Sequence, residues 1–410
     1  MDSTFVFYSI FIILVVEYVL ATALNYLNAK KFKDPIPKDL EDVYNTEEYN
    51  KSQAYKLTNY KFGILTSTFS LALILGFLIL GGFKWVDQIA LNTSDHPIVQ
   101  ALIFFGIILL GSDIINIPFT YYQTFVIEEK FGFNKTSHRT FILDKLKQWT
   151  LTILVGGGVL ALVIWFFQTV GTNFWWYTWV AIALFTLFIN LFYSKLIVPL
   201  FNKQEPLEAG SLKEKIEHYA ANVGFDLQHI FVINGSKRST KANAYFSGFG
   251  KEKRVTLYDT LINDLDEDEI VAVLAHEVGH YKRKHIIFNL FSSILLTGLM
   301  LFLLSLFINN PEISLAIGVD RPSFHAALIG FGILYSPVSE LTGLLMNYFS
   351  RKFEYQADDY AKETYAALPL VTSLKKLSKN SLSNLTPHPA YVFMNYSHPP
   401  LIDRIRNLKA

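Results

Sequence analysis

Cysteine is absent from the 410-residue sequence, which excludes disulfide frameworks, thiolate metal sites and cysteine nucleophiles. Charged residues are also scarce, at 17%, whereas 51% of the residues are hydrophobic and 15% are aromatic. The formal net charge is only +1, so no global field favours nucleic acid or an acidic partner. A chain this apolar and this weakly charged is typical of a membrane protein.

Seven apolar stretches approach the roughly 20 helical residues that cross a bilayer core. They are residues 5–24, 62–83, 98–119, 151–167, 174–200, 286–308 and 324–349. No positive charge precedes the first stretch, which argues against a cleaved signal peptide. Polar side chains inside the stretches, such as Glu17 and Asp113, are costly in lipid and should face an interior. The sequence therefore predicts a mainly α, seven-transmembrane-helix membrane protein.

Lysine and arginine collect in alternate connections between these stretches. Seven lysines lie between the first and second stretches and five basic residues follow the third, whereas the connection between the second and third contains only Lys84. By the positive-inside rule, the N terminus is expected outside, and the C terminus in the cytosol. The polar segment 201–285 then also lies on the cytosolic side.

Segment 201–285 has the mixed pattern of an α+β unit. We expect a helix at 211–223, a strand at 229–233 and a hairpin formed by Asn243-Ala-Tyr-Phe and 254–258 around the glycine-rich turn 248–252. Asp266, followed three residues later by Glu269, is typical of the N-cap of a further helix.

The segment VLAHEVGHYKRKH, residues 273–285, places His276 and His280 four positions apart on that helix. The two imidazoles are then about 40° apart around the helix axis and can bind one ion. Glu277 is placed to take a proton from a water molecule, as in the His-Glu-x-x-His pattern of zinc peptidases. The alternative is a set of ordinary helix-surface residues near a membrane boundary, so the choice depends on a third ligand.

The third ligand is not expected to be His285, which would face about 140° away from His280 on a continuous helix. We expect His285 to be a polar residue at the membrane surface. The segment SRKFEYQADDYAKE, residues 350–363, places Glu354 and Asp358 on one helical face. Glu354 would complete a His₂Glu ligand set, and Asp358 would accept the second ring N–H of a ligating histidine. The alternative is a solvated acidic helix face.

These motifs together resemble the type I CAAX prenyl endopeptidases, a family of integral-membrane zinc metalloproteases. The matching segments are HEVGH at 276–280, SRKFEYQADDYA at 350–361, NAYFSGFG at 243–250, SHPPLIDRI at 397–405 and, more weakly, VIEEKFGFNK at 126–135. The resemblance implies one zinc ion per chain on His276, His280 and Glu354, with Glu277 as the general base. It also implies transmembrane helices that enclose a chamber, with a cytosolic α+β metallopeptidase domain of the gluzincin type.

The same resemblance implies roles for residues that composition and spacing alone would leave as turns. His398 and Arg404 match positions at the active site that face the scissile peptide. An imidazole or guanidinium there would stabilise the developing oxyanion. Asn243, with Ala244 and Tyr245, lies on the edge of the expected hairpin and would bind the substrate as an added strand.

The chain is accordingly expected to contain four regions. They are a membrane region with five transmembrane helices and cytosolic loops at 1–200, a cytosolic α+β segment with the substrate hairpin and the His-Glu-x-x-His helix at 201–285, transmembrane helices six and seven at 286–349, and a C-terminal cytosolic segment with the third ligand and the Ser-His-Pro-Pro motif at 350–410.

The expected function is hydrolysis of peptide bonds within the membrane, with processing of prenylated CAAX-type C termini implied by the resemblance. One alternative is a broad-specificity protease for quality control of membrane proteins. Another is a metal-binding transporter or receptor, but a closed structural zinc site would need a fourth protein ligand, and no cysteine exists to supply it. The chain is shorter than eukaryotic members and ends without a Lys-Asp-Glu-Leu type signal, so we expect a bacterial homologue in the plasma membrane. A eukaryotic homologue would lie in the endoplasmic reticulum.

Overall fold

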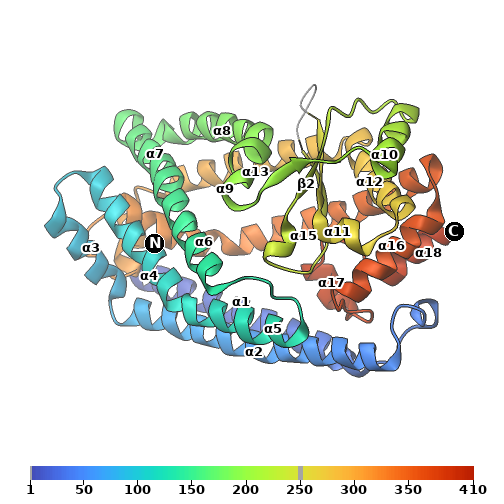
Figure 1. Ribbon diagram of the computed structural model, residues 1–410. Helices are drawn as coiled ribbons and strands as arrows, with labels where there is room; N and C mark the ends of the chain where they lie inside the picture. Colours follow the sequence, from blue (N-terminus) through green and yellow to red (C-terminus); the bar gives the residue numbers. More distant parts are fainter. Residues whose placement is uncertain (1, 248–252) are drawn as a thin grey trace.

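The structure is a computed structural model that describes residues 2–247 and 253–410, most of them helical (Figure 1). Within these residues, six segments are long and apolar enough to cross a membrane: Ser3–Lys33, Thr46–Ile79, Pro97–Phe131, His138–Phe201, His285–Phe307 and Phe324–Thr364. Large apolar side chains on them, such as Leu65, Leu184 and Phe291, are more than half exposed. Such surfaces are stable only against lipid or another apolar phase. The chain is a multi-pass integral membrane protein.

Segment His138–Phe201 contains two of the seven predicted stretches. Its 64 residues far exceed the roughly 20 that one crossing needs. It is built from α6 (His138–Leu151), α7 (Gly157–Val170), α8 (Phe174–Leu196) and α9 (Val198–Phe201). Between α7 and α8 the chain turns at Gly171, whose φ of 60° favours glycine, and the two helices pack against each other. The mainly helical membrane fold is confirmed, while the exact number of crossings stays a prediction.

The other helices of the N-terminal half are α1 (Ser3–Lys30), α2 (Thr46–Ile79), α3 (Gly82–Thr93), α4 (Pro97–Tyr122) and α5 (Glu129–Phe131). The C-terminal half contains α10 (Ser211–Asn222), α11 (Asp259–Asp264), α12 (Glu267–Lys282), α13 (His285–Phe307), α14 (Pro311–Ala316), α15 (Phe324–Thr364), α16 (Ala367–Asn380), α17 (Pro389–Asn395) and α18 (Leu401–Lys409). The halves are interleaved, because α1 packs against α14, α15 and α17.

Asp113, inside one of the predicted membrane stretches, is paired rather than exposed to lipid. It accepts hydrogen bonds from Lys145 and Trp149 at 2.7 Å.

A four-stranded sheet lies beside the membrane helices, with strand order β1-β2-β4-β3. Its strands are β1 (Gln204–Pro206), β2 (His229–Ile233), β3 (Ala244–Ser247) and β4 (Arg254–Tyr258). The predicted strand at 229–233 and the antiparallel pairing of β3 with β4 are confirmed, whereas the predicted turn at 248–252 lies outside the described residues. The parallel pairing of β2 with β4, and β1 itself, are additions to the prediction. Within the described strands β3 is an edge, paired on one side only.

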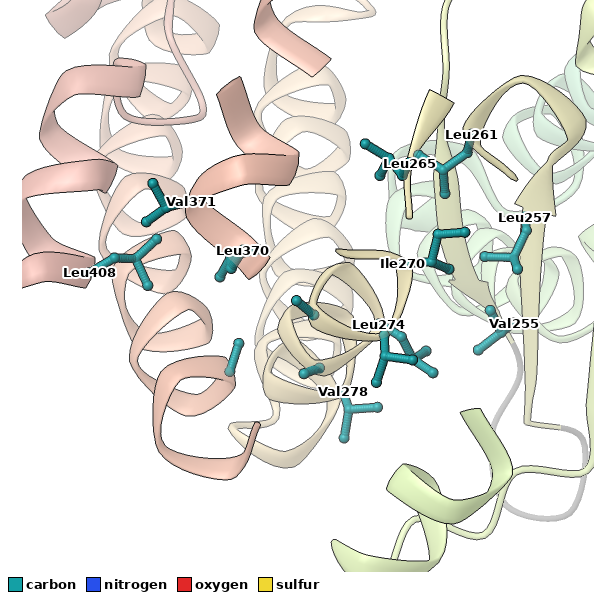
Figure 2. Close-up of a cluster of buried hydrophobic side chains, with 14 of the residues drawn as sticks. Val255, Leu257, Leu261, Leu265, Ile270, Leu274, Val278, Leu370, Val371 and Leu408 are labelled. Carbon is teal, nitrogen blue, oxygen red and sulfur yellow. The ribbon is translucent and has the colours of Figure 1, made fainter. Parts of the chain in front are cut away.

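Helix α12 lies at the centre of the peptidase half. The predicted capping box is present, since Asp266 and Glu269 exchange side-chain hydrogen bonds with each other's backbone at the helix start. Figure 2 shows Ile270, Leu274 and Val278 of α12 amid apolar side chains of β4, α11, α16 and α18. Each fully buried side chain of this size contributes about 1.5–3 kcal/mol relative to exposure. This packing holds α12 in position and thereby fixes the polar residues on its remaining face.

The face of α12 that is not covered by these apolar side chains packs closely against α15. A Cβ placed on Gly279 would lie 3.1 Å from the Cα and carbonyl oxygen of Ala357 and from the Cβ of Tyr360. Only glycine permits this approach without a shift of one helix. Because Gly279 directly precedes His280 and lies three residues after His276, this contact sets the distance from α12 to the carboxylates of α15.

We therefore predict that Gly279→Ala separates α12 from α15. It should cost about 1–3 kcal/mol of stability through overpacking and reduce the retained metal. The matched control is Gly343→Ala, also within a helix, where no atom lies within 4 Å of the added carbon. Thermal unfolding in detergent and metal content per chain measure both effects. Equal values for the two variants would contradict the proposed constraint.

Candidate active site

His276 and His280 of α12 face Glu354 of α15. Their two Nε2 atoms lie 3.1 Å apart. Glu354 Oε2 lies 3.4 Å from His276 Nε2, and Glu354 Oε1 lies 3.3 Å from His280 Nε2. One ligand atom from each residue lies within 4.8 Å of the others, and this is the arrangement expected of a metal site. The structure thus brings together the three residues that the sequence predicted as ligands.

The spacing and chemistry of these donors fit a divalent metal ion. At tetrahedral angles and bond lengths of about 2.0–2.1 Å, donor atoms are about 3.3 Å apart. The two Nε2 atoms are 3.1 Å apart, and each lies 3.3–3.4 Å from a different oxygen of Glu354. Glu354 is only 4% exposed, and its Oε2 accepts no hydrogen bond from the described part of the chain. A buried carboxylate oxygen that accepts no hydrogen bond is costly, and a cation between the three side chains would give it a close ligand contact.

Asp358 lies behind His276 and joins it to Arg404. The Oδ1 atom of Asp358 is 2.8 Å from His276 Nδ1. Arg404 donates from Nη2 to Oδ1 at 2.6 Å and from Nε to Oδ2 at 2.9 Å, a bidentate pair. Burial alone would lower the pKa of His276, but hydrogen bonds with Asp358 and Glu354 raise it to about 9. A proton therefore competes with a metal ion for this imidazole when the ion is absent.

Arg404 is more enclosed than the sequence prediction implied. It is 9% exposed, and its Nη1 lies 3.4 Å from Glu354 Oε2 while its other nitrogens bind Asp358. Burial acts to lower the pKa of the guanidinium, but the hydrogen bond to Asp358 raises it, so Arg404 stays charged. Arg404 lines the cleft, but its contacts with Asp358 and Glu354 favour a role in orienting these two carboxylates. Its contact with a scissile peptide stays a prediction.

His398 lies on the open side of the ligand cluster. Its Nε2 is 3.3 Å from Glu354 Oε1, and its side chain is 64% exposed. Pro399 and Pro400, which follow it, lead directly into α18. His398 can therefore contact a molecule that approaches the three ligand residues from solvent.

A cleft of about 390 Å³ opens over these residues. Its lining includes Glu277 and His398, together with Asn243 and Ala244 at the start of β3. A second cavity of about 610 Å³ shares Asn243 and is lined by Tyr245 and other aromatic and aliphatic side chains. The edge strand β3 thus runs from the ligand cluster toward an apolar cavity.

The sequence interpretation of His285 as a polar residue at the membrane surface is wrong. It is 3% exposed rather than at the membrane surface. The 140° offset assumed a continuous helix, but α12 ends at Lys282 and Lys284 adopts a left-handed φ of 63°. The chain is redirected, and the Nδ1 of His285 comes within 3.0 Å of the Nδ1 of His280. No sequence signal marks this break, since lysine rarely adopts a positive φ.

The remaining nitrogen of His285 fixes the proton positions in this contact. His285 Nε2 lies 2.9 Å from Gln356 Oε1, to which it donates as Nε2–H. His285 Nδ1 then accepts from the Nδ1–H of His280, and this leaves His280 Nε2 unprotonated toward Glu354. His285 is therefore a candidate positioning residue that sequence reasoning missed, because it orients the candidate ligand His280.

Two family models cover almost the whole chain. The model described as CAAX prenyl protease N-terminal, five membrane helices, matches residues 25–203, and the model of peptidase family M48 matches residues 206–410. The chain belongs to peptidase family M48. As a member of that family it is a membrane metalloprotease, and the predicted resemblance is confirmed.

Curated relatives of this M48 peptidase agree over nearly their full length. The chain is 36% identical to "CAAX prenyl protease 1 homolog" of Oryza sativa subsp. japonica, covering 97% of this chain and 95% of the relative. It is 35% identical to "CAAX prenyl protease 1" of Saccharomyces cerevisiae, covering 96% and 93%. The crystal structure of S. mikatae Ste24p superposes with a TM-score of 0.93 at 33% identity, covering 99% of both chains.

We predict that His285→Phe weakens metal binding about 10- to 100-fold, as loss of an outer hydrogen-bond partner does. The ring stacked on Phe353 would be kept, but the acceptor for His280 would be lost. His285→Asn retains an acceptor and should recover part of the affinity. Competition with a chelator measures this in the purified protein, and unchanged affinity in His285→Phe would refute the role.

Proposed function

We propose that this M48 peptidase is a membrane-embedded zinc metalloendopeptidase with one zinc ion per chain held by His276, His280 and Glu354. The observation that carries the proposal is the cluster of donor atoms from His276, His280 and Glu354, which lie within 4.8 Å of one another. One oxygen of the buried Glu354 carboxylate also accepts no hydrogen bond from the described part of the chain. When bound, zinc would polarise the scissile carbonyl and lower the pKa of a water molecule. The His-Glu-x-x-His motif then supplies two ligands and a base from one helix.

Each further residue has a defined task in this proposal. Glu277 lines the cleft beside His276, where it takes a proton from the attacking water and delivers it to the leaving amine. His398, on the open side, stabilises the developing oxyanion. Asp358 holds His276 with its Nε2 toward Glu354, and Arg404 holds Asp358 in place.

The proposed substrates are peptides and membrane-protein segments, including prenylated CAAX-type C termini. Relatives named CAAX prenyl protease 1 support this class. An extended peptide would add to the edge of β3 at Asn243, Ala244 and Tyr245 through main-chain hydrogen bonds. Such binding demands little sequence, so broad specificity toward damaged membrane proteins remains a second candidate function. Membership of a peptidase family gives no support to a transporter or receptor.

We also propose the topology that the basic residues indicate, with the N terminus outside and the site and C terminus in the cytosol. The four regions at 1–200, 201–285, 286–349 and 350–410 follow from it. The relatives from rice and yeast are eukaryotic, and the bacterial plasma membrane stays a prediction beside the endoplasmic reticulum.

Replacing the general base tests the reaction directly. Glu277→Gln should lower the rate of peptide cleavage about 10²–10⁴-fold while zinc content stays at one per chain, because Glu277 is not a ligand. The control is Glu267→Gln on the exposed start of the same helix. Peptide cleavage with metal analysis measures both; loss of zinc, or retained cleavage, would contradict the assignment.

A substitution on β3 tests substrate placement separately. Asn243→Ala should reduce kcat/KM about tenfold by misplacing the scissile bond, without changing zinc content. Asn222→Ala, at the exposed end of α10, is the control. A complex with a peptide mimic lying across residues 387–398, with the edge of β3 free, would rule out this placement and leave the zinc proposal intact.

A further inference from the structure

A pocket of about 410 Å³ lies between α1, α2 and α17, and the proposed peptidase reaction does not use it. Lys56 of α2 is one of its lining residues. This lysine is 8% exposed, and its Nζ has no hydrogen-bond partner anywhere in the described chain. An ammonium group that is buried without a counter-charge is strongly disfavoured.

The partner that Lys56 lacks is not supplied by the pocket itself. The lining residues carry amide, hydroxyl and aromatic groups, among them Asn59, Tyr60 and Tyr391, and no described lining residue is an aspartate or glutamate. Many amides are already engaged, as Asn59 is with Gln123. A negative charge that keeps Lys56 protonated would therefore come from a molecule outside the chain.

The position of the pocket indicates which molecule is available. Its walls are α1 and α2, two of the candidate membrane helices, at the ends where their lysines gather. The lining mixes apolar residues such as Ala21 and Ile64 with polar residues such as Asn25 and Lys56. A mixed lining at the lysine-rich ends of membrane helices is typical of the headgroup level of a bilayer.

We propose that this pocket binds the phosphate group of an anionic membrane phospholipid, with Lys56 as its ion-pair partner. Phospholipid phosphates are always present at the headgroup level, so they would neutralise Lys56 throughout the life of the protein. A carboxylate at the end of a peptide substrate is the competing occupant, because Tyr55 and Tyr396 also line a neighbouring cavity beside His398. Such a peptide would neutralise Lys56 only transiently, and this favours the lipid.

The chain offers two matched controls for this proposal. Lys51 and Lys61 lie five residues before and after Lys56 on the same helix, and both are exposed. We would compare Lys56→Met, Lys51→Met and Lys61→Met in full-length protein, with Lys56→Arg as the variant that keeps the charge. Thermal unfolding in detergent verifies that each variant folds.

The probe is phosphatidylglycerol, with phosphatidylcholine as the zwitterionic comparison. Retained lipid is measured by native mass spectrometry after purification from bilayers of each composition, and affinity by titration of short-chain phosphatidylglycerol. Lys56→Met should bind phosphatidylglycerol about tenfold more weakly, as loss of a charged hydrogen bond predicts. Lys56→Arg and both exposed-lysine variants should bind like the native chain.

Two results would overturn the proposal. Unchanged affinity for phosphatidylglycerol in a folded Lys56→Met protein would show that Lys56 is not the ion-pair partner of a lipid phosphate. Unchanged lipid affinity together with a lost preference for free-acid over C-terminally amidated peptides would assign the pocket to the substrate carboxylate. The lipid result does not depend on which residues hold zinc, since it needs no cleavage.

Discussion

The contact between α12 and α15 at Gly279 is the constraint on which the rest of the site depends. The histidines and the carboxylates come from segments more than 70 residues apart, and neither helix alone holds a complete ligand set. A side chain larger than a hydrogen atom at Gly279 would force the backbones apart. The apolar packing of α12 fixes one partner, and the close backbone approach then fixes the other.

Electrostatics explains why so many charged groups can be buried at this junction. Glu354 and Asp358 carry two negative charges, and Arg404 alone returns only one positive charge. In the absence of a metal ion a protonated His276, whose pKa is raised to about 9, balances the remaining negative charge. A divalent cation on the same residues would take over that role and displace the proton. The outer hydrogen bonds of His276 and His280 differ, one ending on a carboxylate and the other on a neutral imidazole.

Most of this arrangement follows from local sequence patterns, because helical spacing fixes which side chains share a face. His276, His280, Glu354 and the Asp266 cap could all be predicted in this way. The membrane-spanning stretches could also be predicted from hydropathy, but the 64-residue segment His138–Phe201 does not fix the number of membrane crossings. Sequence patterns could not predict the parallel pairing of β2 with β4, because it depends on strands that are distant in the sequence. They also could not predict the position of His285, because it depends on the left-handed backbone of Lys284. The burial of Arg404 likewise arises only when α18 packs against α15.

Helix α15 extends from Phe324 to Thr364, about 60 Å in length, and Pro337 lies in its apolar half. One helix therefore joins the membrane-spanning part of the chain to the candidate active site. A bilayer that is thinner or thicker than its apolar half tilts that half, and the far end, which bears Glu354, moves with it. A change in bilayer thickness would then shift Glu354 relative to His276 and His280 unless the helix bends at Pro337, where a backbone hydrogen bond is lost.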